Sequence, residues 1–122
     1  NGMNVFSFAI SRPPKSVEKF LTDYKINRDT DIDYFLIHQA NKMIVDRIVK
    51  KLKLPQEKVP YNLEEFGNLG GASIPSLMVT RLRKQLMSKE TTLLMSSFGL
   101  GLTWGTMWMK TKPMVMPDII GI

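Results

Sequence analysis

The sequence contains no cysteine and a single histidine, His38, among its 122 residues. The absence of a thiol excludes a cysteine nucleophile, a thiolate metal ligand and a disulfide from this sequence. One histidine also cannot supply a metal site built from several imidazoles. We therefore expect no metal. A chain without cysteine fits the reducing cytoplasm, which is the location we predict.

Long apolar runs are missing as well. No stretch approaches the roughly 18 apolar residues that a membrane-spanning helix needs, so we expect no membrane span. The first residues show no basic segment followed by an apolar one, and so predict no secretory signal. With 43% hydrophobic residues, the chain can form one domain with a modest core.

Acidic residues are outnumbered: 17 Lys and Arg face 11 Asp and Glu, which gives a net charge of +6. Much of the excess falls between Lys42 and Lys58. A basic balance fits nucleic acid, an anionic lipid surface, or an acidic or phosphate-bearing partner, and it also fits simple solubility. Because no recognition motif for nucleic acid is present, we expect no nucleic-acid partner.

The pattern of apolar residues predicts a single α/β domain, a sheet packed by helices. A buried strand over 34–37 leads into a helix over 40–53, whose apolar stripe faces the sheet and whose Asp46 and Lys50 are spaced as an ion pair. Ser73 is the expected N-cap of a later helix. The other expectations are two short helices or one kinked near Pro13, a strand over 59–62, a loop over 63–71, a helix over 73–87, strands over 91–98 and 102–110, and an irregular tail from about 113.

Three turns carry the polar residues that stand out. His38 follows the strand at 34–37 directly, at the edge where open α/β folds bind ligands. Two glycine-rich turns, 66–73 and 98–102, lie further along the chain. Glycine there permits unusual backbone angles or the close approach of a ligand. We expect the three turns to converge on His38.

Three motifs, in order, resemble one family. They are His38-Gln39-Ala40-Asn41, then Phe66-Gly67-Asn68 with Ala72-Ser73-Ile74-Pro75, then Ser97 to Gly105 with the letters SFGLGLTWG. At these distances they resemble the C-terminal half of β-ketoacyl-acyl-carrier-protein synthase III, a thiolase-fold condensing enzyme, from Val5 to about Lys110. The resemblance implies α/β architecture as one half of a thiolase-like fold, with a mixed sheet packed by helices, formed by residues 1–122.

The resemblance also implies a missing part. The family's cysteine nucleophile lies in the other, N-terminal half, so we expect this chain to be inactive alone and to need that half as a partner. The family's half-domain normally has a strand before its first helix, which this sequence lacks. We therefore expect an unfilled position in the sheet and exposed apolar surface that favours self-association. Full-length relatives are usually homodimers.

The family's chemistry gives the first two positions a role. A cysteine takes an acyl group from acyl-CoA, and malonyl-acyl-carrier protein then loses carbon dioxide to give the enolate that attacks it. By resemblance, His38 and Asn68 are the N–H donors that stabilise charge on the thioester oxygen. No cofactor is implied beyond CoA and phosphopantetheine thioesters as substrates. A satisfied core histidine and a turn asparagine in a left-handed conformation are the alternatives.

The last turn has an implied role too. The residues Phe98, Gly99, Leu100 and Gly101 would bring the backbone N–H of Leu100 to the oxyanion of the acyl-cysteine. Many relatives have glycine at Leu100, whose side chain would reshape the pocket. Phe98 would pack on the His38 ring, and an ordinary core aromatic is the alternative.

Acidic acyl carrier protein is the implied partner of the basic helix. The docking candidates are Lys42, Lys50, Lys51 and Lys53, and a solvated helix face is the alternative. Met43 departs from the arginine that relatives often have there. Ala40 and Asn41 resemble residues that line the pantetheine channel, although Asn41 can instead cap the following helix.

Two other classes of function stay open. One is a non-catalytic module that binds carrier protein or CoA. The other is an acyltransferase that passes the acyl group to an alcohol or an amine in place of the malonyl carbanion. Loss of malonyl decarboxylation on replacing His38 or Asn68 would distinguish the condensing enzyme from both.

Overall fold

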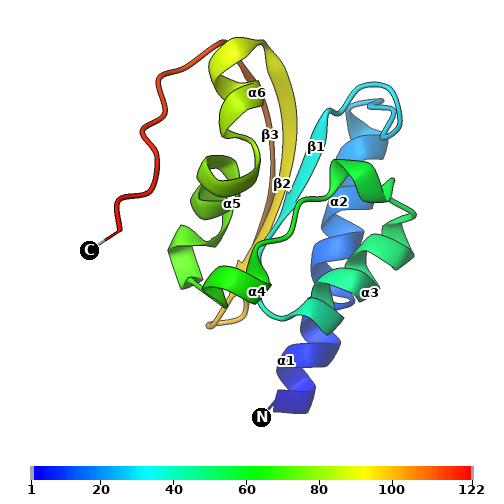
Figure 1. Cartoon of the computed structure of the whole chain (residues 1–122). Helices are drawn as coiled ribbons and strands as arrows, with labels where there is room; N and C mark the ends of the chain where they lie inside the picture. The colour runs from blue at the N-terminus through cyan, green and yellow to red at the C-terminus, as the bar shows by residue number, and fades with distance from the viewer. Residues whose placement is uncertain (1, 122) are drawn as a thin grey trace.

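A three-stranded mixed sheet forms the centre of the molecule in the computed structural model, which describes residues 2–121. Its strands are β1 (Tyr34–Ile37), β2 (Thr91–Gly99) and β3 (Thr103–Thr111), in the order β1-β2-β3 (Figure 1). β1 runs parallel to β2, and β3 runs antiparallel to it. The mixed sheet and all three of these strands were predicted from the sequence, within a residue of their observed ends.

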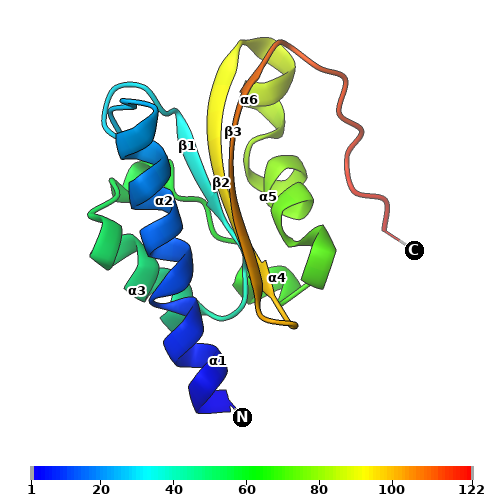
Figure 2. The ribbon, with the colours of Figure 1, turned by 180° about the vertical axis from the view of Figure 1, so that it is seen from behind.

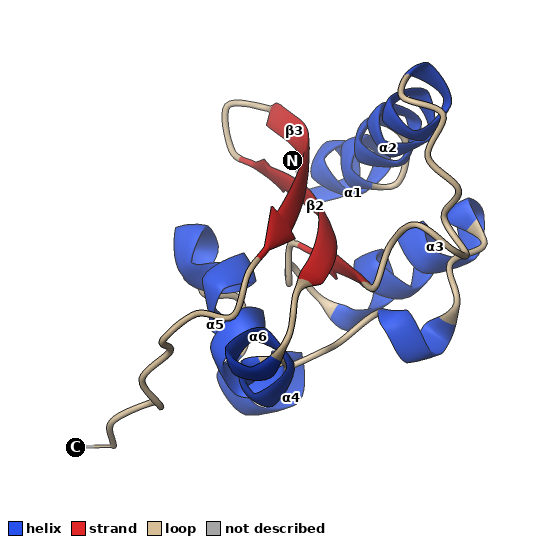
Figure 3. Ribbon diagram, turned by 90° about the horizontal axis from the view of Figure 1, so that it is seen from above, coloured by secondary structure: helices blue, strands red, loops and turns tan. Residues whose placement is uncertain are grey.

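Helices cover both faces of the sheet (Figures 1 and 2). One face carries α1 (Gly2–Ala9), α2 (Arg12–Asp23) and α3 (Lys42–Leu52), and the other carries α5 (Ser73–Arg81) and α6 (Arg83–Ser88). The view from above shows the strands between these two groups of helices (Figure 3). Shorter pieces are α4 (Leu63–Phe66) and the 3₁₀ turns η1 (Gln56–Lys58) and η2 (Gly70–Ala72).

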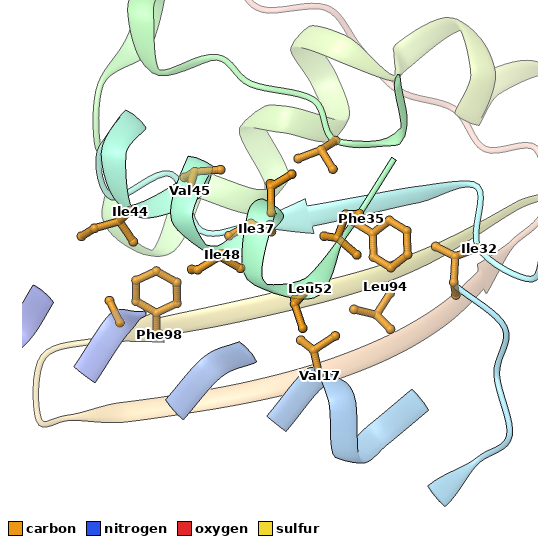
Figure 4. Packing of buried hydrophobic residues seen from close by; sticks show 14 of the residues in the cluster. Val17, Ile32, Phe35, Ile37, Ile44, Val45, Ile48, Leu52, Leu94 and Phe98 are labelled. Atoms are coloured by element: carbon orange, nitrogen blue, oxygen red, sulfur yellow. The ribbon is translucent and has the colours of Figure 1, made fainter. Parts of the chain in front are cut away.

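Alternation along the strands divides the core in two. Phe35 and Ile37 of β1 point to the α1–α3 face, where they pack with Ile48 of α3 and Leu94 of β2 (Figure 4). The intervening Leu36 joins the second cluster, under α5 and α6. Successive side chains of a strand point to opposite faces, so a strand buried on both sides reads as an unbroken apolar run.

The segment 59–62 is not a strand, and that prediction was wrong. Pro60 has no N–H to contribute to a ladder, and the N–H of Asn62 donates to the side chain of Gln39 (3.2 Å). Val59 is nevertheless buried in the core beside α3. Burial of one apolar side chain therefore accounts for the pattern without any strand pairing.

The second half of the chain has more breaks than predicted. The helix expected over 73–87 is two helices, because Leu82 leaves the helical region (φ −118°, ψ 7°). Ser73, the predicted N-cap, is instead the first residue of α5, and the N-cap of this helix is Ala72. The loop expected over 63–71 contains α4 and the start of η2.

One expectation about pairing was also wrong. Asp46 pairs with Lys42 at 2.8 Å, and not with Lys50. The hydroxyl of Tyr61 donates to the other oxygen of Asp46, also at 2.8 Å, which holds the carboxylate toward Lys42. β1 bonds directly to β2 and β2 to β3, so the described strands are contiguous. The unfilled position expected from the missing family strand stays a prediction. The first segment is two helices, one of the two alternatives, and Pro13 lies in the first turn of α2.

The tail after β3 has neither helix nor strand from 112 to 121. It lies along α6, where the N–H of Met114 donates to the carbonyl of Leu86 (3.0 Å) and Arg83 Nε donates to the carbonyl of Met116 (2.9 Å). Met116 is buried in the second cluster. Across residues 2–121, no helix is both long and apolar enough to cross a membrane.

Candidate functional site

His38 stands at the carboxyl end of β1. Its backbone N–H donates to the carbonyl of Ser96 (2.9 Å), which extends the pairing of β1 with β2 by one residue. The side chain is buried, with 8% of its surface exposed. The position at the strand end therefore follows from the apolar run before it, as the sequence predicted.

The imidazole of His38 lies against Phe98 of β2. The two ring centroids are 5.0 Å apart and the rings are nearly perpendicular, at 83°, so the predicted contact is present. Among the described residues, no group makes a hydrogen bond with the imidazole nitrogens. Burial lowers the pKa of His38 from its usual 6.5, because the charged ring loses solvation. A neutral ring with a free N–H is a suitable donor to a reacting oxygen.

Asn68 lies in the turn between α4 and η2. Gly67 and Gly70 supply the left-handed backbone angles there (φ 64° and 58°). Lys25 and Lys53 are the only described residues other than glycine with positive φ, so the left-handed alternative for Asn68 was wrong. The side-chain oxygen of Asn68 accepts from the N–H of Gly70 (2.9 Å). This bond fixes the carboxamide and leaves its N–H₂ group available as a donor.

The hairpin between β2 and β3 forms the third turn. Gly99 and Thr103 are cross-strand partners, and Gly101 has φ 109°, which a side chain would strain. Leu100 is 88% exposed, so its side chain points into solvent. Phe98 faces Trp104 across the same hairpin, and Trp104 packs on Phe8 of α1 with centroids 5.5 Å apart.

These three turns meet at one hollow of about 460 Å³. Its lining comprises His38, Asn68, Gly70, Gly71, Ser97, Phe98, Gly99, Leu100 and Thr103. The structure thus brings together His38, Asn68 and the hairpin residues, except that Gly101 is not part of the lining. Sequence reasoning missed Ser97 and Thr103, although the alternation of β2 and the start of β3 could have located them.

The predicted channel residues lie outside this hollow. Asn41 caps α3, because its side-chain oxygen accepts from the N–H of Ile44 (2.9 Å). Ala40 is half-buried and packs on the first core cluster. Of the two interpretations of Asn41, the structure contains the cap.

The four candidate lysines do not form one surface. Lys42 is paired with Asp46, whose pKa that contact lowers. Lys50 lines a shallow hollow on the outside of α3 together with Lys42, Met43, Asp46 and Arg47. Lys51 donates to the carbonyl of Ile10 (3.1 Å), and Lys53 ends the helix in a left-handed conformation. Lys42 and Lys50 therefore lie on one side of α3.

The hollow presents the hydrogen-bond donors of His38 and Asn68. Residues 2–121 contain no cluster of three or more side chains suited to holding a metal ion. The hydroxyl of Ser96, the cross-strand partner of Ile37, is buried and has no hydrogen-bond partner among residues 2–121. Two neutral donors in one partly enclosed hollow can stabilise negative charge on an oxygen, which is how enzymes lower the barrier of acyl chemistry.

Comparison with known proteins places these turns in context. The sequence model of the family described as 3-oxoacyl-[acyl-carrier-protein (ACP)] synthase III C terminal matches residues 25–111. The beta-ketoacyl-[acyl-carrier-protein] synthase III of Microcystis aeruginosa is 44% identical over 106 residues, which are 86% of this chain and 31% of that protein. That of Streptococcus sanguinis is 39% identical over 109 residues, 88% of this chain and 33% of the relative.

Solved structures agree with this result. The 3-oxoacyl-(acyl-carrier protein) synthase of Burkholderia xenovorans has a TM-score of 0.91 and 36% identity, and covers 97% of this chain and 34% of its own. The 3-oxoacyl-(acyl carrier protein) synthase III of Pseudomonas aeruginosa has a TM-score of 0.82 and 32% identity, over 96% of this chain and 36% of its own. This chain spans about a third of the length of the curated relatives it matches.

Proposed function

Because the chain belongs to the 3-oxoacyl-[acyl-carrier-protein] synthase III family and matches its C-terminal domain, we propose that it supplies the hydrogen-bond donors of a decarboxylative condensation. The fold is half of a thiolase-like fold. The substrates are an acyl-CoA and a malonyl group on acyl carrier protein. The product is a 3-oxoacyl thioester for fatty acid or related biosynthesis.

The proposed step divides the work between two parts of the enzyme. A cysteine from the N-terminal half carries the acyl group as a thioester. The malonyl C–C bond breaks, carbon dioxide leaves, and the electron pair moves onto the thioester oxygen, where His38 and Asn68 donate. The carbanion then forms a bond to the acyl carbonyl, and the cysteine thiolate leaves. This chain has no thiol, so alone it is inactive in this reaction.

The single observation that carries the proposal is the shared hollow. His38 comes from the end of β1 and Asn68 from a loop 30 residues later, yet both line it together with the hairpin that contacts His38. The lowered pKa of His38 supports the same role. A neutral donor does not hold the substrate carboxylate by charge and so does not oppose its departure.

The test uses a synthase in which this chain forms the C-terminal third. Malonyl decarboxylation is measured for His38→Ala and for Asn68→Ala, with Met87→Ala, an exposed residue of α6 on the opposite face of the sheet from α3, as the control. Loss of one oxyanion donor typically costs about 100-fold to 1000-fold in kcat, so each site variant should fall by that amount. Full decarboxylation in both site variants would refute the proposal and favour a non-catalytic carrier-protein or CoA module.

A further inference from the structure

Gln39, the residue after His38, is fully buried. A buried amide costs free energy unless its donors and acceptor are satisfied. We infer that Gln39 is a positioning residue that holds the Asn68 loop at a fixed place relative to His38. This inference rests on the proposed function, and it assigns Gln39 no contact with substrate.

Three hydrogen bonds connect Gln39 to three separate segments. Its side-chain Nε2 donates to the carbonyl of Ile37 in β1 (2.8 Å). Its Oε1 accepts from the backbone N–H of Asn62 (3.2 Å), and its own backbone N–H donates to Ser73 Oγ (2.7 Å). Asn62 and Ser73 are themselves buried, at 2% and 1% exposure.

The two distant partners are the two ends of one loop. The loop begins at Asn62, which contacts Gln39, and then forms α4, the Asn68 turn and η2. It ends at Ser73, which contacts Gln39 again. Both ends of this loop are therefore held by the residue adjacent to His38. Fixing both ends of a loop removes much of its conformational freedom.

The loop has a second attachment, to α5, whereas among residues 2–121 the side chain of Asn68 makes no hydrogen bond to the body of the fold. The side-chain Nδ2 of Asn62 donates to Ser76 (2.9 Å) and Thr80 (3.2 Å) on α5. Asn68 itself bonds within its turn, to Gly70. The position of its carboxamide relative to the imidazole thus depends on where the loop ends are held.

A positioning role predicts a larger effect on rate than on binding. Misplacement of a reacting group by about 1 Å can cost on the order of 100-fold in rate. Gln39 influences the positions of both donor side chains: it is bonded directly to His38 in the chain, and its hydrogen bonds hold the two ends of the loop that carries Asn68. Replacing a residue that only stabilised the core would lower the free energy of unfolding and leave the rate of the folded enzyme unchanged.

The test compares Gln39→Met, which keeps the side-chain length without its hydrogen bonds, with the milder Ser73→Ala, which removes one anchor. Thr111→Val is the matched control. Thr111 ends β3 at the end away from the hairpin, and its buried hydroxyl donates to the carbonyl of Thr91 (3.3 Å). In the synthase with this chain as its C-terminal third, we expect kcat for malonyl decarboxylation to fall about 10-fold to 100-fold in Gln39→Met and at least threefold in Ser73→Ala. KM should stay within about threefold, and Thr111→Val should keep its kcat.

Amide hydrogen exchange on the 122-residue chain supplies a readout that needs no activity. Ser73→Ala should speed exchange over residues 63–72 and leave β1 unchanged, whereas Thr111→Val should not affect 63–72. Unchanged kcat in Gln39→Met and Ser73→Ala, or equal exchange in the loop, overturns the inference. If that occurs while His38→Ala and Asn68→Ala still lose decarboxylation, the positioning role fails and the proposed function stands. If those two keep full activity, the proposed function fails.

Discussion

At the scale of single residues, the environment of His38 decides its charge. The imidazole is buried and lies against Phe98. No acidic group is among the causes of its pKa shift, and desolvation is the one that acts. Removal from water disfavours the charged form of a base, so its pKa falls below 6.5 and the ring is neutral at pH 7.

The first prediction concerns this titration. His38 is the only histidine, so its ring protons give unambiguous NMR signals. In the folded chain they should titrate with a midpoint below 6.5, and in concentrated urea the midpoint should return to about 6.5. A folded midpoint at or above 6.5 would contradict the burial of the ring.

The same shift links pH to stability. Between the folded and unfolded pKa values the unfolded chain binds more protons, so the contribution of His38 is fully present above pH 6.5 and is lost as pH falls toward the folded pKa. Urea unfolding between pH 7.5 and 5.5 should therefore show stability falling on acidification. The His38→Gln variant should show a smaller fall over this range.

Sequence reasoning reached some residues of the site and not others. His38 was found because four large apolar residues precede the only imidazole, and the Asn68 turn because its glycines mark it. Gln39 carried no such signal. Its role depends on Asn62 and Ser73, which come into contact with it only when the chain has folded.

At the scale of elements, the N-cap of α3, Asn41, fixes the start of the helix shortly after His38. Asn41 has an extended backbone (φ −156°, ψ 163°), and its side chain accepts from the N–H of Ile44. The cap satisfies a backbone donor that the helix itself leaves unpaired. It also fixes where the chain turns after His38.

The second prediction distinguishes the cap from a substrate contact. Asn41→Ala should lower the free energy of unfolding by about 1 kcal/mol, measured by urea titration, because the cap is lost. Asn41→Asp keeps a capping oxygen and should stay within about 0.5 kcal/mol of the parent chain. Equal stability of the alanine variant would show that the cap contributes little and return Asn41 to the channel interpretation.

The elements themselves were predictable where the apolar residues form a clear pattern. α3 buries apolar residues at the helical period, whereas β1 is a short unbroken apolar run that is buried on both faces. The break at Leu82 has no glycine or proline to mark it, and Leu82 is itself buried in the second cluster. The short α4 was hidden because two acidic residues, Glu64 and Glu65, make up half of its length.

At the scale of the whole molecule, cationic side chains lie on both sides of the sheet. Arg47 and Lys50 lie on the outside of α3 with the exposed Met43. Lys84 and Lys89 lie at α6, on the other side of the sheet. We propose the α3 side as the docking surface for acidic acyl carrier protein, since the helix begins four residues after His38 and its cationic side chains would orient the carrier.

The third prediction tests this surface by charge reversal. In the synthase with this chain as its C-terminal third, Arg47→Glu with Lys50→Glu should weaken the Kd for acyl carrier protein about tenfold at low salt, and added salt should reduce the difference. Lys84→Glu with Lys89→Glu changes the net charge equally on the other face and should stay within about twofold. Equal affinity of both double variants at low salt would exclude the α3 surface.

The hairpin that joins β2 and β3 carries two rings on one side, each against a different neighbour. Phe98 rests on the imidazole, and its cross-strand partner Trp104 rests on Phe8 near the start of the chain. A ligand that displaces the hairpin would therefore change the environment of the Trp104 indole as well as that of the imidazole. In a Trp108→Phe variant, which leaves Trp104 as the one indole, tryptophan emission would report such a displacement without a label.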